Sequence, residues 1–262
     1  KKTNITQKII LLTRHGERID QTYLRNKQKL LTDDPELTQL GREQAAKMGV
    51  MIKEFLSKKF SLPVEDNIQV VSSPFSRTIQ TSFGLVQGYN IQHKLKIDNK
   101  ICELINRWVV GDIPSKYVSV YLPPNNCGNS EKYRNKLEQF ENNTLEFYDP
   151  LTKDDLPVMW ESDKNVLNRV NKSMNDNIRQ FCYDSSPSKQ VVQFVSHAGV
   201  LSDMRNEIMK KMYGGTNKQD WEYCIDYSYF NYCDTDVFLV SMDESGKMKF
   251  EHYDKLSLFK KY

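Results

Sequence analysis

The sequence predicts an α/β fold in three layers, with helices on both faces of a mostly parallel central sheet. Short apolar runs alternate along the chain with amphipathic stretches at helical spacing, the order expected of parallel strands joined by crossover helices. Polar and charged residues directly follow three of the apolar runs, as expected where ligands bind beyond the carboxyl ends of parallel strands. A chain of 262 residues can form one domain with a substantial core, so we expect a single domain over residues 1–262.

The first predicted strand is the run from Ile9 to Thr13, and the first predicted helix extends from Leu37 to Phe60. Thr38 is a suitable N-cap for this helix, and the helix ends before Pro63. Its apolar stripe consists of Leu40, Ala45, Met48, Met51, Ile52 and Phe55.

A second strand, Ile68 to Val71, leads through Pro74 into a helix that carries Arg77 near its beginning. The free backbone N–H groups and the dipole of a helix N-terminus favour a phosphate there. We therefore expect this helix start to border an anion-binding site.

Prolines and asparagines interrupt the alternation between Leu104 and Trp160. We expect a long excursion there, at about residues 104–160, with a run from Leu95 to Ile97 as the strand before it and one short helix near Glu131 to Phe140. Such an excursion usually covers or borders a site.

The alternation then resumes. We expect a helix from Glu161 to Phe181, a strand from Gln190 to Ser196, and a helix from Gly199 to Met212. A strand from Asp236 to Met242 and an edge strand from Lys247 to His252 complete the sheet.

An imidazole lies between two guanidinium groups directly after the first strand, in the sequence Arg14-His15-Gly16-Glu17-Arg18. Arginine binds two phosphate oxygens at once and offsets the charge that develops during phosphoryl transfer. An unprotonated imidazole nitrogen is nucleophilic at neutral pH, whereas a serine hydroxyl needs its own base. The motif indicates a histidine that attacks a phosphate, and the alternative is a basic cluster at the surface.

Two further motifs follow predicted strands. SSPFSRTIQT occupies residues 72–81, and VSHAG occupies residues 195–199. Because the carboxyl ends of parallel strands meet at one edge of a sheet, five side chains are expected to converge. They are Arg14, His15, Arg18, Arg77 and His197.

With these motifs the chain resembles the histidine phosphatase superfamily, in its phosphoglycerate-mutase-like branch, from Ile9 to about Val240. The residues that match are Arg-His-Gly at 14–16, LTQLGREQA at 37–45, SSPFSRTIQT at 72–81 and Ser-His-Ala-Gly at 196–199. Arg18 and the long segment after Glu103 look more like the suppressor-of-T-cell-receptor-signalling and ecdysteroid-phosphate phosphatase group than like glycolytic mutases. The acid phosphatase and phytase branch ends in a His-Asp pair, where this chain has His197-Ala198.

The resemblance implies a phosphoglycerate-mutase-like fold and a role for each converging residue. His15 would carry the phosphoryl group as a phosphohistidine, and Arg14, Arg18 and Arg77 would bind the phosphate oxygens. His197 would donate another hydrogen bond as the charge shifts during transfer. With these donors the chemistry needs no metal and no cofactor. The alternatives are a structural, hydrogen-bonded role for His15 and a solvated salt bridge for Arg18.

Protonation of the leaving oxygen requires an acid, and the resemblance implies Glu103, which follows the run from Leu95 to Ile97. Glu17, beside the nucleophile, is the alternative, and Asp20 is a third candidate. A carboxyl group near a bound phosphate dianion has a raised pKa, as a general acid requires.

Mutases of this superfamily continue past their acid with Arg-x-Tyr-Gly and Gly-x-x-Lys, whereas this chain has LINRWVVG at residues 104–111. We therefore expect a phosphomonoesterase acting on a phosphoprotein or another bulky phosphate ester. A mutase-type phosphotransferase and a catalytically idle interaction subunit that keeps the fold are the alternatives. Aromatic side chains of the excursion form a rim for a bulky ester or else pack the excursion onto the core: Trp108, Tyr117, Tyr121, Tyr133 and Trp160.

Charge, cysteine content and hydropathy bear on binding partners, compartment and membrane insertion. A formal net charge of +3 is too weak to indicate nucleic-acid binding. The five cysteines are odd in number and lack Cys-x-x-Cys spacing, which favours a reducing, cytoplasmic compartment. No apolar stretch approaches the roughly 20 residues of a membrane span. Because the sequence begins at Lys1, an upstream leader stays open, and so does a homodimer, since some relatives dimerise through sheet edges.

Overall fold

The computed structural model describes residues 7–20, 35–65, 67–91, 95–103, 145–147, 163–183, 189–213, 229–243 and 245–259. These residues form an α/β structure around one seven-stranded sheet, as the alternation of elements predicts. The strands are β1 (Lys8–Arg14), β2 (Ile68–Ser72), β3 (Leu95–Ile97), β4 (Leu145–Phe147), β5 (Val191–Ser196), β6 (Thr235–Met242) and β7 (Met248–Leu256). The helices are α2 (Gln39–Phe60), α3 (Ser76–Tyr89), α6 (Asp163–Tyr183) and α7 (Ala198–Tyr213), together with the short 3-10 helix η1 (Asn99–Ile101).

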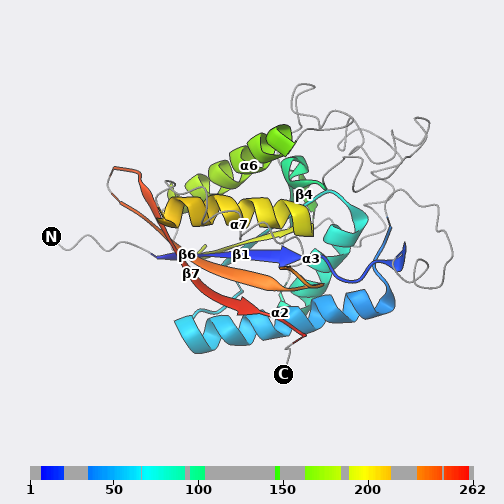
Figure 1. Cartoon of the computed structure of the whole chain (residues 1–262). Coiled ribbons are helices and arrows are strands. Elements are labelled where there is room, and N and C mark those ends of the chain that lie inside the picture. The colour runs from blue at the N-terminus through cyan, green and yellow to red at the C-terminus, as the bar shows by residue number, and fades with distance from the viewer. Residues whose placement is uncertain are drawn as a thin grey trace.

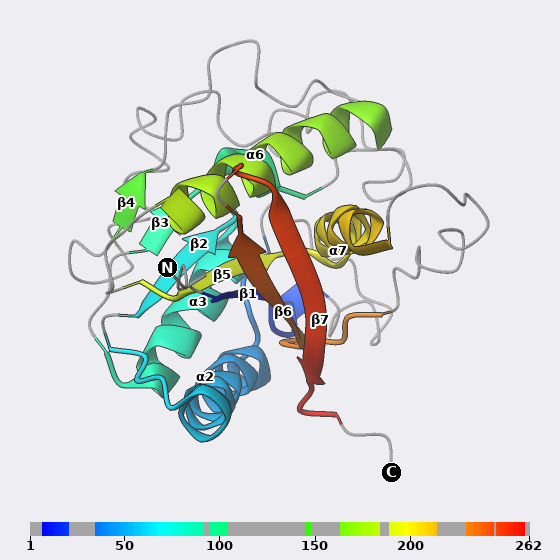
Figure 2. The same cartoon turned by 90° about the vertical axis from the view of Figure 1, so that its left-hand side faces the viewer.

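The sheet is mostly parallel, with the strand order β4-β3-β2-β5-β1-β6-β7. The strands from β4 to β1 run parallel, and β6 and β7 are added antiparallel at one edge. Helices α2 and α3 cover one face of the sheet, and α6 and α7 cover the other, which gives three layers (Figures 1 and 2). The carboxyl ends of β1, β2 and β5 meet at one edge, where Arg14 pairs with Ser196 and Ser72 with Val195.

Strand β1 is buried on both faces, which explains its unbroken apolar run. Ile9 and Leu11 belong to the cluster that includes α2 and α3, whereas Ile10 and Leu12 belong to the cluster that includes α6 and α7. Burying each of these side chains stabilises the fold by roughly 1.5–3 kcal/mol. A well-anchored strand therefore ends at Arg14 and fixes the backbone position of His15.

Helix α2 has the predicted N-cap. The Thr38 Oγ1 accepts a hydrogen bond from the Gly41 N–H at 2.9 Å. The helix itself begins at Gln39 rather than at Leu37, because Leu37 forms an isolated β-bridge with Arg18. The start of α2 is thus tied to the segment that follows His15.

The prediction that Leu40 belongs to the buried stripe of α2 is wrong, since its side chain is 50% exposed. The buried face uses small residues instead, among them Gly41, Ala45 and Gly49. A Cβ added at Gly49 would lie 2.4 Å from the Leu85 carbonyl oxygen of α3. Helices α2 and α3 therefore pack backbone against backbone, a contact that hydrophobic periodicity does not detect.

The other predicted elements agree with the structure to within a few residues, with two larger differences. Strand β7 continues to Leu256 instead of ending at His252. Strand β4 lies inside the segment predicted to hold only loops and a short helix, and it extends the sheet by pairing with β3. The short helix predicted near Glu131 to Phe140 lies outside the described residues.

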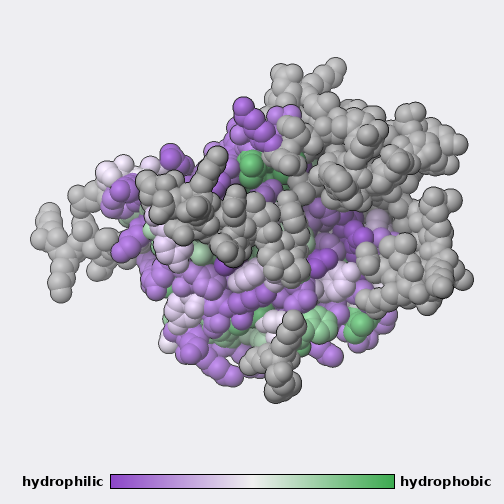
Figure 3. Space-filling view, in the orientation of Figure 1, coloured by the Kyte–Doolittle hydropathy of each residue, from purple (hydrophilic) through white to green (hydrophobic). Residues whose placement is uncertain are grey.

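The surface of the described residues is mainly hydrophilic on the face shown in Figure 3, where hydrophobic side chains form small separate patches. Even α2, with 22 residues, carries Lys58 and Lys59 in its last turn. Within the described ranges, no helix combines the length and the hydropathy needed to cross a bilayer.

Candidate active site

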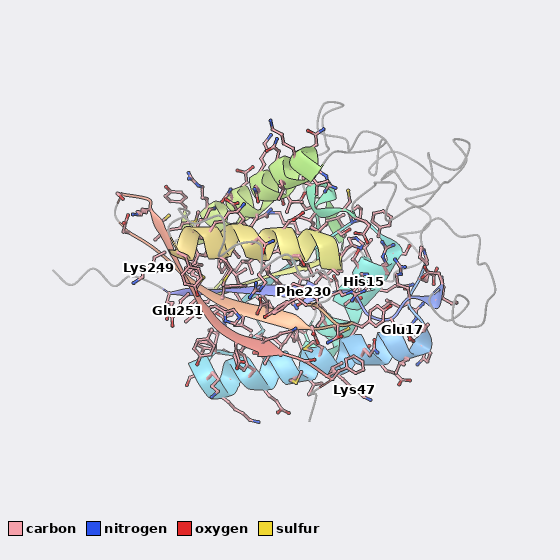
Figure 4. The ribbon with its side chains drawn as sticks, viewed as in Figure 1. His15, Glu17, Lys47, Phe230, Lys249 and Glu251 are labelled. Atoms are coloured by element: carbon pink, nitrogen blue, oxygen red, sulfur yellow. The ribbon has the colours of Figure 1, made fainter. Side chains whose placement is uncertain are left out.

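The predicted site residues converge beyond the carboxyl ends of the parallel strands. His15 follows β1, Arg77 lies in the first turn of α3, and His197 follows β5. The rings of His15 and His197 have centroids 5.4 Å apart, and Arg77 Nη2 lies 3.1 Å from His197 Nδ1. Figure 4 shows His15 at the end of β1, with Glu17 near the first turn of α2 and with Lys249 and Glu251 at the opposite end of the sheet.

His15 is buried, and its hydrogen bonds fix both its backbone and its ring. Its N–H donates to the Ser196 carbonyl at 3.0 Å, and its Nδ1 lies 2.8 Å from the Gly16 carbonyl oxygen. Because a carbonyl only accepts, Nδ1 carries the proton of the neutral ring and Nε2 keeps its lone pair. Burial, then the positive charge of Arg77 and the neighbouring His197, hold the pKa of His15 well below its ordinary value. The ring is therefore neutral and nucleophilic at neutral pH.

Gly16 allows the nucleophile segment to touch α2 directly. A Cβ added at Gly16 would lie 2.5 Å from the Gly41 carbonyl oxygen, and one added at Gly41 would lie 2.4 Å from the Glu17 carbonyl oxygen. The Gly16 N–H also donates to Thr81 Oγ1 of α3 at 3.0 Å. The carbonyl that orients His15 is thus itself held by α2 and α3.

Arg14 lies beside His15, and its side chain is partly buried. Its Nη1 donates to the Phe230 carbonyl at 2.6 Å, and its guanidinium carbon lies 4.5 Å from the centroid of the Tyr232 ring. Its Nε is buried and has no hydrogen-bond partner among the described residues. Burial lowers the pKa of Arg14, while Tyr232 and Glu103 oppose that effect. A donor of this arginine is therefore left for a ligand.

Arg77 is also buried, with 3% of its side chain exposed. Its guanidinium carbon lies 4.5 Å from the centroid of the Phe75 ring, and its Nη2 lies 3.4 Å from Glu103 Oε2. Arg77 thus links the start of α3 to Glu103.

Arg18 is more exposed than the other two arginines, with 22% of its side chain accessible. Its Nη2 donates to Asp20 Oδ2 at 2.9 Å, and its Nε is buried without a hydrogen-bond partner among the described residues. Its charge lowers the pKa of both His15 and Glu103, though less than nearer groups do. Arg18 therefore combines the predicted salt bridge with a position at the pocket.

His197 links Glu103 to the end of β2. Its Nδ1 lies 3.1 Å from Glu103 Oε2, and its Nε2 lies 2.9 Å from Ser73 Oγ. A serine hydroxyl can donate or accept, so the bond to Ser73 survives a change of tautomer or of charge on His197. Burial lowers the pKa of His197 to about 4, with Glu103 opposing and Arg77 reinforcing the shift.

Glu103 has an ionised carboxyl group in this arrangement. Burial by itself would raise its pKa, but His197, which donates a hydrogen bond to it, and the charges of Arg77 and Arg18 outweigh burial and hold the pKa well below its usual range. A negative charge bound by the same arginines would weaken this effect and raise the pKa.

The backbone that carries Glu103 is fixed from α6. Arg169 donates to the carbonyl oxygens of Lys100, Cys102 and Glu103 at 2.7, 3.1 and 3.3 Å. The buried Asp98 accepts from the Lys100 N–H at 2.9 Å and from Ser173 and Asn177 of α6. These supports were not predicted from the sequence, because they join segments about 70 residues apart.

The two alternative acids are engaged elsewhere. Glu17 Oε2 accepts a hydrogen bond from Thr38 Oγ1 at 2.9 Å, so this carboxylate is held at the start of α2. Asp20 forms the ion pair with Arg18 described above. Glu103, by comparison, contacts both Arg77 and His197.

Sequence reasoning missed the aromatic side chains of the site. Phe75 packs against His197 with ring centroids 5.2 Å apart, and Tyr232 lies 5.9 Å from the His15 ring. Phe75 lies inside the SSPFSRTIQT motif and could have been noticed, whereas Tyr232 carries no motif. The five aromatic residues proposed as a rim lie outside the described residues.

The described residues were also compared with the ligand sets that bind metal ions. In the part of the chain that the structure describes, no group of three or more His, Cys, Asp or Glu side chains is arranged to hold a metal ion. The donors gathered here are mainly guanidinium and imidazole N–H groups, which suit an anion.

Solved structures with the same fold include phosphatases and a mutase. Ecdysone phosphate phosphatase from Bombix mori, in complex with tungstate, is 18% identical with a TM-score of 0.55, and the match covers 88% of each chain. A mycobacterial glucosyl-3-phosphoglycerate phosphatase is 16% identical with a TM-score of 0.52, covering 94% of this chain and 97% of the other. Phosphoglycerate mutase from Bacillus anthracis is 14% identical with a TM-score of 0.50, covering 97% and 95%. These likenesses show the phosphoglycerate-mutase-like fold.

At the level of sequence, no curated protein matches the chain significantly. A family model does match, over residues 10–106, a segment that contains Arg14, His15, Arg77 and Glu103. That model describes the histidine phosphatase superfamily, branch 1, so the match over residues 10–106 agrees with the resemblance that the motifs predicted.

Proposed function

We propose that the protein is a phosphomonoesterase that works through a phosphohistidine on His15. The observation that carries this proposal is the 2.8 Å contact between His15 Nδ1 and the Gly16 carbonyl, which directs the lone pair of Nε2 away from the protein backbone. The lowered pKa of His15 keeps that lone pair free of a proton. A buried, oriented, neutral imidazole among arginines is suited to attack a phosphate.

The phosphate is bound by guanidinium and imidazole donors. Arg14 and Arg18 each retain a buried Nε without a hydrogen-bond partner among the described residues, and Arg77 and His197 lie beside Glu103. Such donors are already in place when charge builds on the transferring group, so little reorganisation is required. The proposal includes no metal ion, because these side chains supply the positive charge.

In the first step, His15 Nε2 forms a bond to phosphorus while the bond from phosphorus to the leaving oxygen breaks. Glu103 transfers its proton to that oxygen. The arginines keep Glu103 ionised before the substrate binds, but the phosphate dianion offsets their charge and raises the pKa of Glu103, so that it takes up a proton with the substrate.

In the second step, water attacks the phosphohistidine. The Glu103 carboxylate takes a proton from the water, the phosphorus–nitrogen bond breaks, and inorganic phosphate leaves. Glu103 is then protonated and His15 is neutral again, so the cycle is balanced without another reactant.

Water rather than a second substrate is the proposed acceptor. The sequence LINRWVVG after Glu103 departs from the pattern with which mutases bind a carboxylated sugar phosphate. The predicted excursion follows Glu103 directly in the sequence, so we propose that residues 104–160 border the leaving-group side of the site within one domain. A phosphoprotein or another bulky ester is the proposed substrate class.

Rapid-quench labelling tests the mechanism. With a radiolabelled aryl phosphate, we expect acid-labile, base-stable phosphate on His15, and no label on His15→Ala. A His15→Ala variant that keeps normal aryl phosphatase turnover would refute the mechanism. Label that passes from a bisphosphoglycerate to a monophosphoglycerate, without release of inorganic phosphate, would indicate a phosphotransferase instead. A panel of phosphotyrosine peptides, steroid phosphates and sugar phosphates then ranks the substrates.

A further inference from the structure

Residues 229–234, here called the C-terminal turn, lie against the nucleophile although they match none of the sequence motifs. Tyr232 places its ring over the guanidinium of Arg14 at 4.5 Å, with its centroid 5.9 Å from that of His15. Phe230 accepts a hydrogen bond from Arg14 Nη1 through its carbonyl oxygen. The turn therefore contacts the Arg14 guanidinium at two places: the Tyr232 ring lies on its face, and the Phe230 carbonyl accepts a hydrogen bond at its edge.

The turn is fixed to the nucleophile by an unusual backbone conformation. Cys233 has a φ of 60°, in the left-handed region that residues other than glycine rarely adopt. Its N–H points to the carbonyl oxygen of His15, with an N···O distance of 3.4 Å. This conformation follows Tyr232 directly and sets where its ring lies.

The side of the turn that faces away from His15 is fixed as well. Asp234 Oδ2 accepts from the Asn231 N–H at 2.9 Å and pairs with Lys255 Nζ at 3.1 Å. The ring of Tyr229 has Lys255 at 3.8 Å and Arg205 at 4.3 Å from its centroid. Contacts from β7 and α7 thus hold the turn that carries Tyr232.

We propose that Tyr232 is a positioning residue that holds the Arg14 guanidinium in the orientation in which it binds the phosphate. This inference rests on the proposed function. A guanidinium on a flexible side chain gains a fixed plane from an aromatic ring on its face, and the ring quadrupole also offsets the cost of burying the cation. Arg77 has the same arrangement on Phe75, at the same 4.5 Å. Arg14 and Arg77 of the pocket therefore each have an aromatic ring on one face of the guanidinium.

Affinity for inorganic phosphate and orthovanadate, measured by calorimetry on the full chain, tests the proposal. Tyr232→Leu removes the ring. We expect this variant to bind both anions roughly 5- to 30-fold more weakly, which is the range for a desolvated cation–π contact. Tyr232→Phe keeps the ring and should restore affinity to within about 3-fold. Tyr253→Leu is the matched control, because its ring packs against Phe55 and Phe60 instead.

A double-mutant cycle shows whether Tyr232 acts through Arg14. In an Arg14→Ala background, the loss caused by Tyr232→Leu should disappear, because the guanidinium that the ring orients is absent. A loss of the same size in that background overturns the proposal, and so does a Tyr232→Leu variant that binds both anions as the unaltered protein does. Thermal unfolding of each variant separates a global loss of structure from a local one.

Two phosphonates distinguish positioning from contact with the leaving group. The affinity of Tyr232→Leu for methylphosphonate and for phenylphosphonate should fall by the same factor. A fall confined to phenylphosphonate overturns the positioning role. If the unaltered protein binds none of the four anions, the proposed phosphate pocket fails together with the inference. If it binds them and Tyr232→Leu has no effect, the inference alone fails.

Discussion

Two clusters of charged residues lie on the central sheet, and they differ in the ratio of cationic side chains to carboxylates. The proposed phosphate pocket gathers Arg14, Arg18, Arg77, His15 and His197 around Glu103. The edge cluster, formed by Arg205, Tyr229, Asp234, Asp236, His252 and Lys255, lies on α7, β6, β7 and the turn before β6. In the edge cluster Asp236 is fully buried and pairs with both Arg205, at 3.0 Å, and His252, at 2.7 Å.

The difference lies in how the positive charges are compensated. In the edge cluster, buried carboxylates meet the cations within the protein, so a further anion would gain little there. In the pocket, three arginines share Glu103 and Asp20, and two buried Nε groups have no hydrogen-bond partner among the described residues. A surplus of oriented cationic donors, rather than the presence of arginine and histidine, distinguishes an anion site from a structural cluster.

The largest effect is expected for the carboxylate of the pocket. Glu103→Gln should slow hydrolysis of phenyl or alkyl phosphates by about 10²- to 10⁴-fold, because it cannot protonate a poor leaving group. Hydrolysis of nitrophenyl phosphate should slow much less in this variant, since its phenolate leaves without full protonation. Steady-state kinetics on both ester classes measure the contrast.

Glu17→Gln is the matched control for Glu103→Gln, because Glu17 is also buried and adjacent to His15 but bonds to Thr38. We expect no dependence on the leaving group for this variant. The assignment of Glu103 is wrong if the leaving-group dependence belongs to Glu17→Gln and Glu103→Gln slows both ester classes equally.

Arginines from the two clusters should separate activity from stability. Arg77→Ala should lower kcat/KM by about 10²- to 10³-fold, the usual cost of losing a donor to the developing charge. It should lower the free energy of unfolding less than Arg205→Ala does, because the lost contact with Glu103 is offset by weaker repulsion among the neighbouring guanidinium groups. Kinetics and urea unfolding provide the two measurements.

Arg205→Ala should show the opposite pattern, because it takes a partner from the buried Asp236. We expect stability to fall by roughly 3 kcal/mol, as when a buried ion pair loses one member. Its kcat/KM should change far less than that of Arg77→Ala. Equal losses of activity in the two variants would contradict the distinction between the clusters.

A smaller effect is expected from the buried histidines of the pocket as the pH falls. The pKa of His197 is lowered to about 4 and that of His15 also lies well below its usual value, so both stay neutral in the folded protein. The unfolded chain takes up these protons below about pH 6.5. Since the unfolded state then binds more protons, stability should fall on acidification from about pH 6.5 to 4, by on the order of 1 kcal/mol per pH unit for each histidine.

Urea unfolding between about pH 6.5 and 5 measures this slope. His197→Gln removes one of the two groups, so its stability should depend less steeply on pH than that of the unaltered protein. An unchanged slope in His197→Gln would mean that His197 is protonated in the folded protein.

The sequence predicted the convergence of the pocket because topology decides it. The apolar runs that end at Arg14 and Ser196 are adjacent parallel strands, so the residues after them had to meet at one edge. The resemblance already favoured Glu103 over Glu17, and the structure adds that Thr38 is bonded to Glu17 and that His197 contacts Glu103.

Tyr232 and Leu40 show why other features could not be predicted. Tyr232 reaches Arg14 only because β6 pairs with β1 over a separation of more than 200 residues, and no local pattern signals that contact. Leu40 was assigned to the core by periodicity, but its side chain is exposed, and Gly41, Ala45 and Gly49 are buried where α2 closely approaches neighbouring backbone. Contacts made by small residues and by distant backbone carry little hydrophobic signal.

In the proposed mechanism, the bond from His15 Nδ1 to the Gly16 carbonyl also decides which isomer of the phosphohistidine forms. An imidazole offers two nitrogens to phosphorus, and the resulting N-phosphohistidines differ in their chemical shifts and their lifetimes. With Nδ1 occupied by a backbone group that no side-chain substitution can remove, only the Nε2 adduct is accessible. The backbone therefore determines which nitrogen of His15 is phosphorylated, and the same nitrogen should be phosphorylated in variants that have lost most of their hydrolysis rate.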